Sequence, residues 1–224
     1  SDSSVLAVDL SLSSLSYAIR KTQELLVSNI DYMQADILEL HKLDRQFDLI
    51  ESSGVLHHMA EPLAGWKVLV DLLRPRGLMK IGLYSEIARQ HIIETRIFIA
   101  KNDYGSSQEA IRQCRVEIMG MPTKADSKIS KVLNSSDFYS LSTCRDLLFH
   151  VQEHRFTLPE IETALKELGL MFIGFELKDR RVTTRFKKLN SRKESLTSLP
   201  LWHQFELNNP DTFAGMYQFW VQKI

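Results

Sequence analysis

The stretch FDLIESSGVLHH, residues 47–58, decides the fold of this chain. Its first five residues include Phe, Leu and Ile, and such a short apolar run is typical of a strand buried in a sheet. The polar turn Ser52-Ser53-Gly54 follows, and apolar residues at helical spacing begin at Leu63. A strand that ends in a polar turn and leads into a helix is the repeating unit of an α/β sheet.

The same unit recurs on both sides of this stretch. Apolar runs predict further strands over residues 5–8, 30–33 and 78–84. Ser11 can cap a helix after the first of them, and the tract RPRG at residues 74–77 is a helix stop before the last. This order predicts an α/β fold with a Rossmann-like doubly wound sheet and helices on both of its faces.

Residues 86–156 interrupt the alternation with a series of predicted helices. We expect an insertion that lies over the strand ends as a lid and substrate region. Its helices are expected over residues 86–101, 106–119, 127–133 and 143–150. Five of its aromatic residues are suited to line a pocket, with simple packing as the alternative: Phe98, Tyr104, Phe138, Tyr139 and Phe149.

The alternation resumes at Thr157, which forms a capping box with Glu160 and begins a helix that Gly169 is suited to end. Strands over 170–177 and 216–221, and a short helix near 200–205, complete the expected elements. The expected division is 1–85 as a partial Rossmann-like cofactor half, 86–156 as the helical insertion, and 157–224 as the remaining helix and strands of the same sheet.

The composition excludes several classes of protein. Lys and Arg together number 28, as do Asp and Glu, so the chain lacks the basic excess of most nucleic-acid binders. Two cysteines are too few for a disulfide framework and fit a cytoplasmic protein. No apolar run approaches the roughly 20 residues of a membrane span. His150, Glu153 and His154 could form a metal or base cluster, but a polar helix face is favoured and no metal site is expected.

Ligands of open α/β sheets bind at the carboxyl ends of the strands. Asp9 follows the first predicted strand, and an acid in this position can accept hydrogen bonds from both hydroxyls of a ribose. The alternative is that Asp9 caps the next helix. A nicotinamide enzyme would also use such an acid, but Asp36 after the next strand and the loop SSGVLHHM at residues 52–59 argue against that class.

Four stretches together resemble the second through fifth strands of class I S-adenosylmethionine-dependent methyltransferases in order and spacing. They are VLAVDLS at 5–11, QADI at 34–37, FDLIESSGVLHH at 47–58 and LRPRGLM at 73–79. The resemblance is close over residues 5–85 and loose over 157–178. More narrowly, CRDLLFHVQE at 144–153 and MYQFW at 216–220 resemble methyltransferase domains that follow tetratricopeptide repeats in bacterial proteins.

The resemblance implies S-adenosyl-L-methionine as the cofactor and assigns its adenosine part to four residues. Asp9 resembles the acid that binds the ribose, and Leu10 resembles the residue that lies against the adenine. Asp36 resembles the acid that accepts from the adenine amino group. Ile37 would donate its backbone N–H and pack on the ring.

The resemblance also implies a methionine and substrate side. Ser52, Ser53 and Gly54 resemble the loop that lies near the methionine part of the cofactor and the substrate. Tyr84 and Glu86 follow the strand over 78–84 and are candidates to face the substrate.

His57 and His58 are the candidate catalytic residues. A histidine here could act as a general base on an acceptor hydroxyl, because its ordinary pKa lies near neutral pH. The loop lacks the Asn/Asp-Pro-Pro-Tyr/Phe form used on amino groups of bases and amides, which argues against that substrate class. The alternative for the pair is that His57 faces solvent and that His58 begins the following helix.

The chain departs from the family pattern at its beginning. The family's first strand ends in a glycine-rich turn that approaches the cofactor, and no segment before Val5 can supply it. Either the natural protein extends upstream and this chain is N-terminally truncated, which we favour, or the chain is a remnant of the domain. In both cases we expect a gap between the strands that end at Asp9 and Glu51. Either these two strands pair directly, or a second copy fills or covers the gap, or upstream residues remain associated there.

The sequence thus predicts a methyltransferase whose methyl acceptor, a small molecule or a protein, is not identified. The intact protein is expected to be an enzyme, and this chain by itself is expected to bind the cofactor weakly or not at all. The alternative function is a non-catalytic methyltransferase-like module that binds other proteins.

Overall fold

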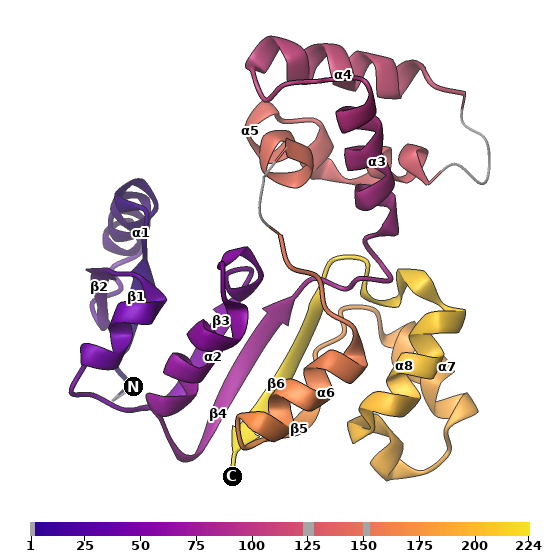
Figure 1. Cartoon of the computed structure of the whole chain (residues 1–224). Helices are drawn as coiled ribbons and strands as arrows, with labels where there is room; N and C mark the ends of the chain where they lie inside the picture. The colour runs from indigo at the N-terminus through magenta and orange to yellow at the C-terminus, as the bar shows by residue number, and fades with distance from the viewer. Residues whose placement is uncertain (1–2, 123–127, 150–152) are drawn as a thin grey trace.

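The computed structural model of the chain describes residues 3–122, 128–149 and 153–224. These residues form two sheets and a separate group of helices (Figure 1). The first sheet holds the parallel strands β1 (Val5–Asp9) and β2 (Ile30–Gln34). The second sheet has the order β3-β4-β6-β5. Its strands are β3 (Phe47–Ser53), β4 (Leu73–Leu83), β5 (Leu170–Phe175) and β6 (Tyr217–Lys223).

Strand direction in the second sheet changes at β6. β3 and β4 run parallel, whereas β6 lies antiparallel between β4 and β5. Alternating strands and helices thus form an α/β fold, and the apolar runs of the sequence locate each strand within a few residues. The mixed strand directions were not part of the expectation, because strand orientation depends on the path of the connections.

The sequence predicted that the tract RPRG lies before β4 and stops the preceding helix. In the structure this tract lies within β4. Leu73 pairs with Phe47 and Leu78 pairs with Leu49, so residues 74–77 bulge out of the ladder. Arg76 adopts a φ of 62° there, a left-handed conformation that accommodates the bulge. The preceding helix, α2 (Pro62–Asp71), has already ended.

The predicted helix caps are confirmed. Ser11 caps α1 (Leu12–Glu24), and its hydroxyl accepts from the Ser14 N–H at 3.2 Å. Thr157 and Glu160 form the capping box of α6 (Leu158–Glu167), in which the Thr157 N–H donates to a Glu160 carboxylate oxygen at 2.7 Å. The 3-10 helix η1 (Ile37–Lys42) follows β2 and packs beside α2.

The connection between β5 and β6 holds more helix than the single short one predicted. It contains α7 (Arg180–Leu189), η6 (Lys193–Thr197), α8 (Leu199–Asn208) and η7 (Pro210–Phe213). The Phe186 ring of α7 stacks on Trp202 of α8, with ring centroids 3.7 Å apart. Phe186 is the one fully buried residue of the charged helix α7, so the sequence carries too little apolar pattern to predict it.

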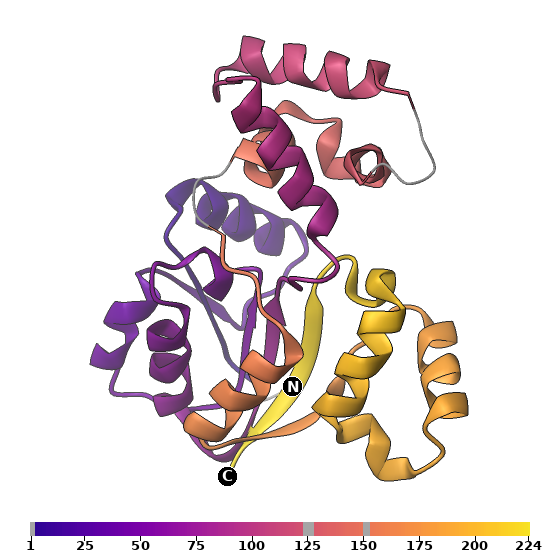
Figure 2. The ribbon, with the colours of Figure 1, turned by 45° about the vertical axis from the view of Figure 1, so that its right-hand side comes forward.

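The described residues of the ranges 90–122 and 128–149 form a second body with its own core. Its elements are α3 (Gln90–Lys101), α4 (Gln108–Gly120), η3 (Ile129–Asn134), η4 (Ser136–Phe138), α5 (Leu141–Cys144) and the π-helix η5 (Arg145–Phe149). This body stands beyond the carboxyl end of β4 in both views (Figures 1 and 2). Phe98, Tyr104, Phe138 and Phe149 pack into its core, whereas Tyr139 is 53% exposed, so packing accounts for the first four of these aromatic residues.

The main core lies on one face of the second sheet. Met79, Ile81 and Leu83 of β4 are fully buried there, in a core that α2, α6 and α8 share. The opposite face carries Leu49 and Met171, which are 52% and 51% exposed. The prediction that helices cover both faces is therefore wrong for this sheet in the part of the chain that the structure describes.

The two sheets each present an open edge. Among the described strands, β1 pairs only with β2 and β3 pairs only with β4. Direct pairing of β1 with β3, one of the three expected arrangements, is therefore not formed. None of the described helices has both the length and the apolar character needed to cross a membrane.

The capping box at Thr157 gives a direct test of this fold. Thr157→Ala removes the hydroxyl that accepts from the Glu160 N–H, and should lower the free energy of unfolding by about 1 kcal/mol. Thr163→Ala is the matched control, since the exposed Thr163 hydroxyl only bonds back to the Pro159 carbonyl of the same helix. Urea unfolding measures both variants, and equal losses would contradict the role of the cap.

Candidate functional site

The carboxyl edge of the first sheet gathers the residues expected to bind adenosine. Asp9 and Gln34 are partners in the β1–β2 register, and the Ala35 N–H donates to the Asp9 carbonyl at 3.3 Å. Asp9 accepts from the Ser11 N–H at 2.7 Å, which forms the turn before α1, although Ser11 is the actual cap. The Asp9 side chain is solvent-exposed, so it remains accessible to a ligand.

Asp36 occupies a matching position after β2. It caps η1 by accepting from the Leu38 N–H at 2.9 Å, and Ile37 beside it is half-buried against the main core. Leu10, in contrast, is 65% exposed next to Asp9. Asp9, Leu10, Asp36 and Ile37 therefore all lie at the carboxyl edge of the first sheet, as the sequence predicted. They offer two carboxylates and two apolar side chains.

The loop after β3 lies at the carboxyl edge of the second sheet. The Ser52 hydroxyl is buried and finds no hydrogen-bond partner in the described chain. The Ser53 hydroxyl contacts the Met216 sulfur at 3.6 Å, and Gly54 turns the chain with a φ of 81°. The neighbouring strand approaches closely because Gly82 has no Cβ, which would lie 2.4 Å from the Ser53 hydroxyl.

His57 lies inside the protein, so the alternative that it faces solvent is wrong. It belongs to the short helix η2 (Leu56–His58) and is fully buried. Its ring lies against Tyr84, with ring centroids 3.8 Å apart, and neither ring nitrogen makes a well-aligned hydrogen bond among the described residues, although the Gly82 backbone is close enough to oppose the lowering of the His57 pKa. Burial, followed by the charges of His58 and Arg89, lowers the pKa of His57 to about 3.

His58 lies next to this ring and remains partly exposed. Its ring meets that of His57 edge-on at 4.4 Å and that of Tyr84 at 5.9 Å. His58 ends η2, and α2 begins only at Pro62, so the alternative that His58 begins the helix is also wrong. The two histidines and Tyr84 thus form one aromatic cluster.

Tyr84 joins this cluster to a charged residue that the sequence did not single out. The Arg89 guanidinium lies 3.7 Å from the centroid of the Tyr84 ring, on which it is stacked. Burial raises the pKa of Tyr84, an effect that Arg89 opposes. Glu86, the other candidate of this region, forms an ion pair with Arg155 at 2.7 Å and is thus already held by a neighbour.

Glu153 binds arginines and is not positioned as a metal ligand. Its carboxylate is almost fully buried and accepts from Arg89 at 2.8 and 3.0 Å and from Arg96 at 3.0 Å. His150, the other member of the cluster considered in the sequence, lies outside the described residues. The described part of the chain contains no group of three or more His, Cys, Asp or Glu side chains suited to a metal ion.

Sequence reasoning missed Arg89 and Arg96 for a physical reason. Arg89 and Glu153 are 64 residues apart, and only the insertion brings them together. The sole local signal was an arginine shortly after a strand end, a position that usually faces solvent.

The predicted site residues form two groups on two sheets. Asp9, Leu10, Asp36 and Ile37 share the edge of the first sheet, while Ser52–Gly54, the histidines and Tyr84 share the edge of the second. No backbone pairing joins β1 to β3 among the described strands. The edge residues therefore cluster within each sheet, and the two sheets meet through side-chain packing, such as that of Ile37 against the main core, without a strand ladder between them.

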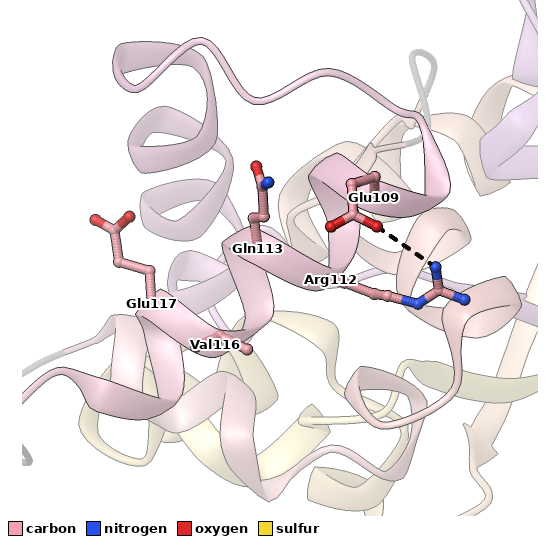
Figure 3. A pocket seen from close by; sticks show the side chains of 5 residues that line it. All are labelled: Glu109, Arg112, Gln113, Val116 and Glu117. Atoms are coloured by element: carbon pink, nitrogen blue, oxygen red, sulfur yellow. Dashed lines mark ion pairs between the residues drawn. The ribbon is translucent and has the colours of Figure 1, made fainter.

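One groove lies away from all of these residues. It follows the outer face of α4 and is lined by Glu109, Arg112, Gln113, Val116 and Glu117 (Figure 3). Glu109 and Arg112 form an ion pair at 3.7 Å across one helical turn. A single helix supplies every lining side chain, so this groove is no candidate for the site.

The buried imidazole makes a prediction about pH. The pKa of His57 is about 3 in the folded chain and about 6.5 when unfolded, so between these values the unfolded chain alone takes up the proton. Stability should therefore fall as pH decreases from 6.5 toward 3. Between about pH 7 and pH 5 the wild type should lose about 1–2 kcal/mol more than His57→Phe in urea unfolding. Equal losses would show that His57 is not buried in this way.

The chain shares its fold with known methyltransferases. Residues 1–81 match the family model of a methyltransferase domain. PKMT2 from Rickettsia typhi, solved in complex with AdoHcy, has a TM-score of 0.70 at 13% identity, over 97% of this chain and 43% of that one. An S-adenosylmethionine-dependent methyltransferase from Mesorhizobium loti has a TM-score of 0.52 at 18% identity, over 99% of this chain and 81% of that one.

A curated relative matches along nearly the whole sequence. An uncharacterized protein of Synechococcus sp. is 26% identical over 216 residues, which cover 91% of this chain and 50% of the relative. The chain thus spans about half the length of that relative. Taken together, the chain has a Rossmann-like class I methyltransferase fold, and its first 81 residues match a methyltransferase domain.

Proposed function

We propose that this chain is the methyltransferase part of an enzyme that uses S-adenosylmethionine. The observation that carries the proposal is the pair of acids, Asp9 and Asp36, at the ends of neighbouring parallel strands in this fold. Asp9 is suited to the ribose hydroxyls and Asp36 to the adenine amino group. The exposed Leu10 and the half-buried Ile37 offer the apolar surface that a purine ring needs.

The residues of the second sheet fit the methionine part of the cofactor and the acceptor. The buried Ser52 hydroxyl has no partner in the described chain, and such a group is costly unless a ligand or water satisfies it. When bound, S-adenosylmethionine would supply a methyl group on a positively charged sulfur. Ser52, Ser53 and Gly54 would line this side of the site.

The two histidines take different roles in this proposal. A group with a pKa of about 3 is a poor base near neutral pH, so His57 serves as a neutral hydrogen-bonding group. His58 is partly exposed and is the candidate that removes the proton from an acceptor hydroxyl. Tyr84 would face the acceptor, which is a small molecule or a protein, and Glu86 would contribute to the rim of its site.

The helical insertion, residues 86–156, has the role of a lid in this proposal. Its helices stand beyond the carboxyl end of β4 (Figure 1), and Arg89, the N-cap of α3, is stacked on the Tyr84 ring. A lid in this position would exclude water from the reacting groups. The acceptor would then bind between the insertion and the loop after β3.

Asp9→Ala in the full natural protein tests the cofactor site. Loss of charge-assisted hydrogen bonds to the ribose should weaken binding of S-adenosylhomocysteine by about 10- to 150-fold in titration calorimetry. Asp31→Ala is the matched control, because this exposed acid lies on the same strand pair, opposite Leu6 and away from the carboxyl edge. Unchanged affinity of a folded Asp9→Ala variant would remove Asp9 from the site.

A second experiment tests whether the two halves must be joined. With β1 and β3 unpaired, the 224-residue chain alone should give no measurable binding of S-adenosylmethionine by calorimetry. Micromolar binding by this chain would contradict the expectation. If the full natural protein also failed to bind, the non-catalytic interaction module would become the better description.

A further inference from the structure

A buried ion network connects the two ends of the helical insertion. Arg89 and Arg96 lie on the outgoing side, at the start of α3 and within it, and Glu153 lies on the returning side. The Glu153 side chain is 1% exposed and that of Arg89 is 6% exposed. Both nitrogens of the Arg89 fork contact the two carboxylate oxygens, a bidentate geometry that fixes both side chains.

The same arginine extends into the aromatic cluster. Its guanidinium lies on one side of the Tyr84 ring, whose centroid is also 3.8 Å from that of the His57 ring. The contacts therefore form a series: Glu153 binds Arg89, Arg89 stacks on Tyr84, and Tyr84 packs against His57. His154 adds a second contact, since its N–H donates to the His57 carbonyl at 2.7 Å.

The burial of this ion network has a large free-energy cost if its role is only to hold the insertion in place. Burying a carboxylate and a guanidinium costs several kcal/mol per ion, which their attraction only offsets when the geometry is good. Apolar side chains could hold the two ends of the insertion together without this cost. An exposed ion pair would also cost less, and the insertion contains one between Lys128 and Glu94. The desolvation cost of the network is better explained if the network positions a side chain of the functional site.

We propose that Glu153 is a positioning residue of the acceptor site: it holds Arg89 against Tyr84 and thereby keeps the Tyr84 ring closed over His57. The inference rests on the proposed function in so far as the acceptor binds at these residues. It adds that the returning end of the insertion, and not only the loop after β3, controls the shape of that site.

The chain of contacts has a consequence for the imidazole. The groups that face His57 are the Tyr84 ring, His58, Arg89 and His154. If Glu153 no longer orients Arg89, the stack loosens and water reaches His57. Its pKa should then rise from about 3 toward the value of about 6.5 that an exposed histidine has.

Glu153→Gln in the full natural protein tests the proposal, with ¹³C-labelled histidines observed by NMR and the His57 signal assigned through His57→Phe. In the wild type this signal should stay constant between about pH 5.5 and pH 8, and in Glu153→Gln it should move with pH as the pKa rises. Glu94→Gln, which removes the surface ion pair of the same insertion, should leave His57 unchanged.

The outcomes separate positioning from simple fastening. A Glu153→Gln variant that melts at a lower temperature while His57 still does not titrate would overturn the proposal. If Glu153→Gln does not fold, Arg89→Met should give the same His57 signal change, and Arg96→Met, which leaves the Arg89–Glu153 pair intact, should not. The readout needs neither cofactor nor acceptor, so failure of methyl transfer would not be mistaken for failure of this inference.

Discussion

The burial of β4 is the constraint on which the rest of this structure depends. This strand pairs with β3 on one side and with β6 on the other, and its residues Met79, Ile81 and Leu83 are fully buried. The chain that leaves it at Ser85 is fixed by a buried network, in which Ser85 donates to Glu206 at 2.6 Å and Tyr217 donates to the other carboxylate oxygen at 2.7 Å. The carboxyl end of β4 is therefore anchored to α8 and to the start of β6.

That anchor explains why the candidate site lies where it does. Tyr84 stands between the end of β4 and Ser85, so the aromatic ring against which His57 packs is attached to backbone that this buried network holds. Burial raises the pKa of Glu206, and its two hydrogen bonds to hydroxyl groups oppose this shift. A buried carboxylate satisfied in this way specifies one arrangement of the elements that meet there.

The insertion and the sheet are separate packing units that meet at polar contacts. Ile111, Cys114 and Ile118 of α4 belong to the second core and share no buried cluster with β4. The contacts between the two units include the stacking of the Arg89 guanidinium on the Tyr84 ring and the short parallel bridge between Ser85 and Phe156. Because the two cores are separate clusters of buried residues, movement between the units would leave each core intact.

The sequence by itself determined the strands, the caps and the grouping of site residues at strand ends, because apolar runs and capping patterns are local signals. It placed Asp9 and Asp36 on one edge, since parallel strands end on the same side. Only the tertiary structure decided that His57 is buried, because a histidine pair on a loop carries no local sign of what covers it. The Arg89–Glu153 contact also came from the structure alone, since it depends on how the insertion returns to the sheet after 64 residues.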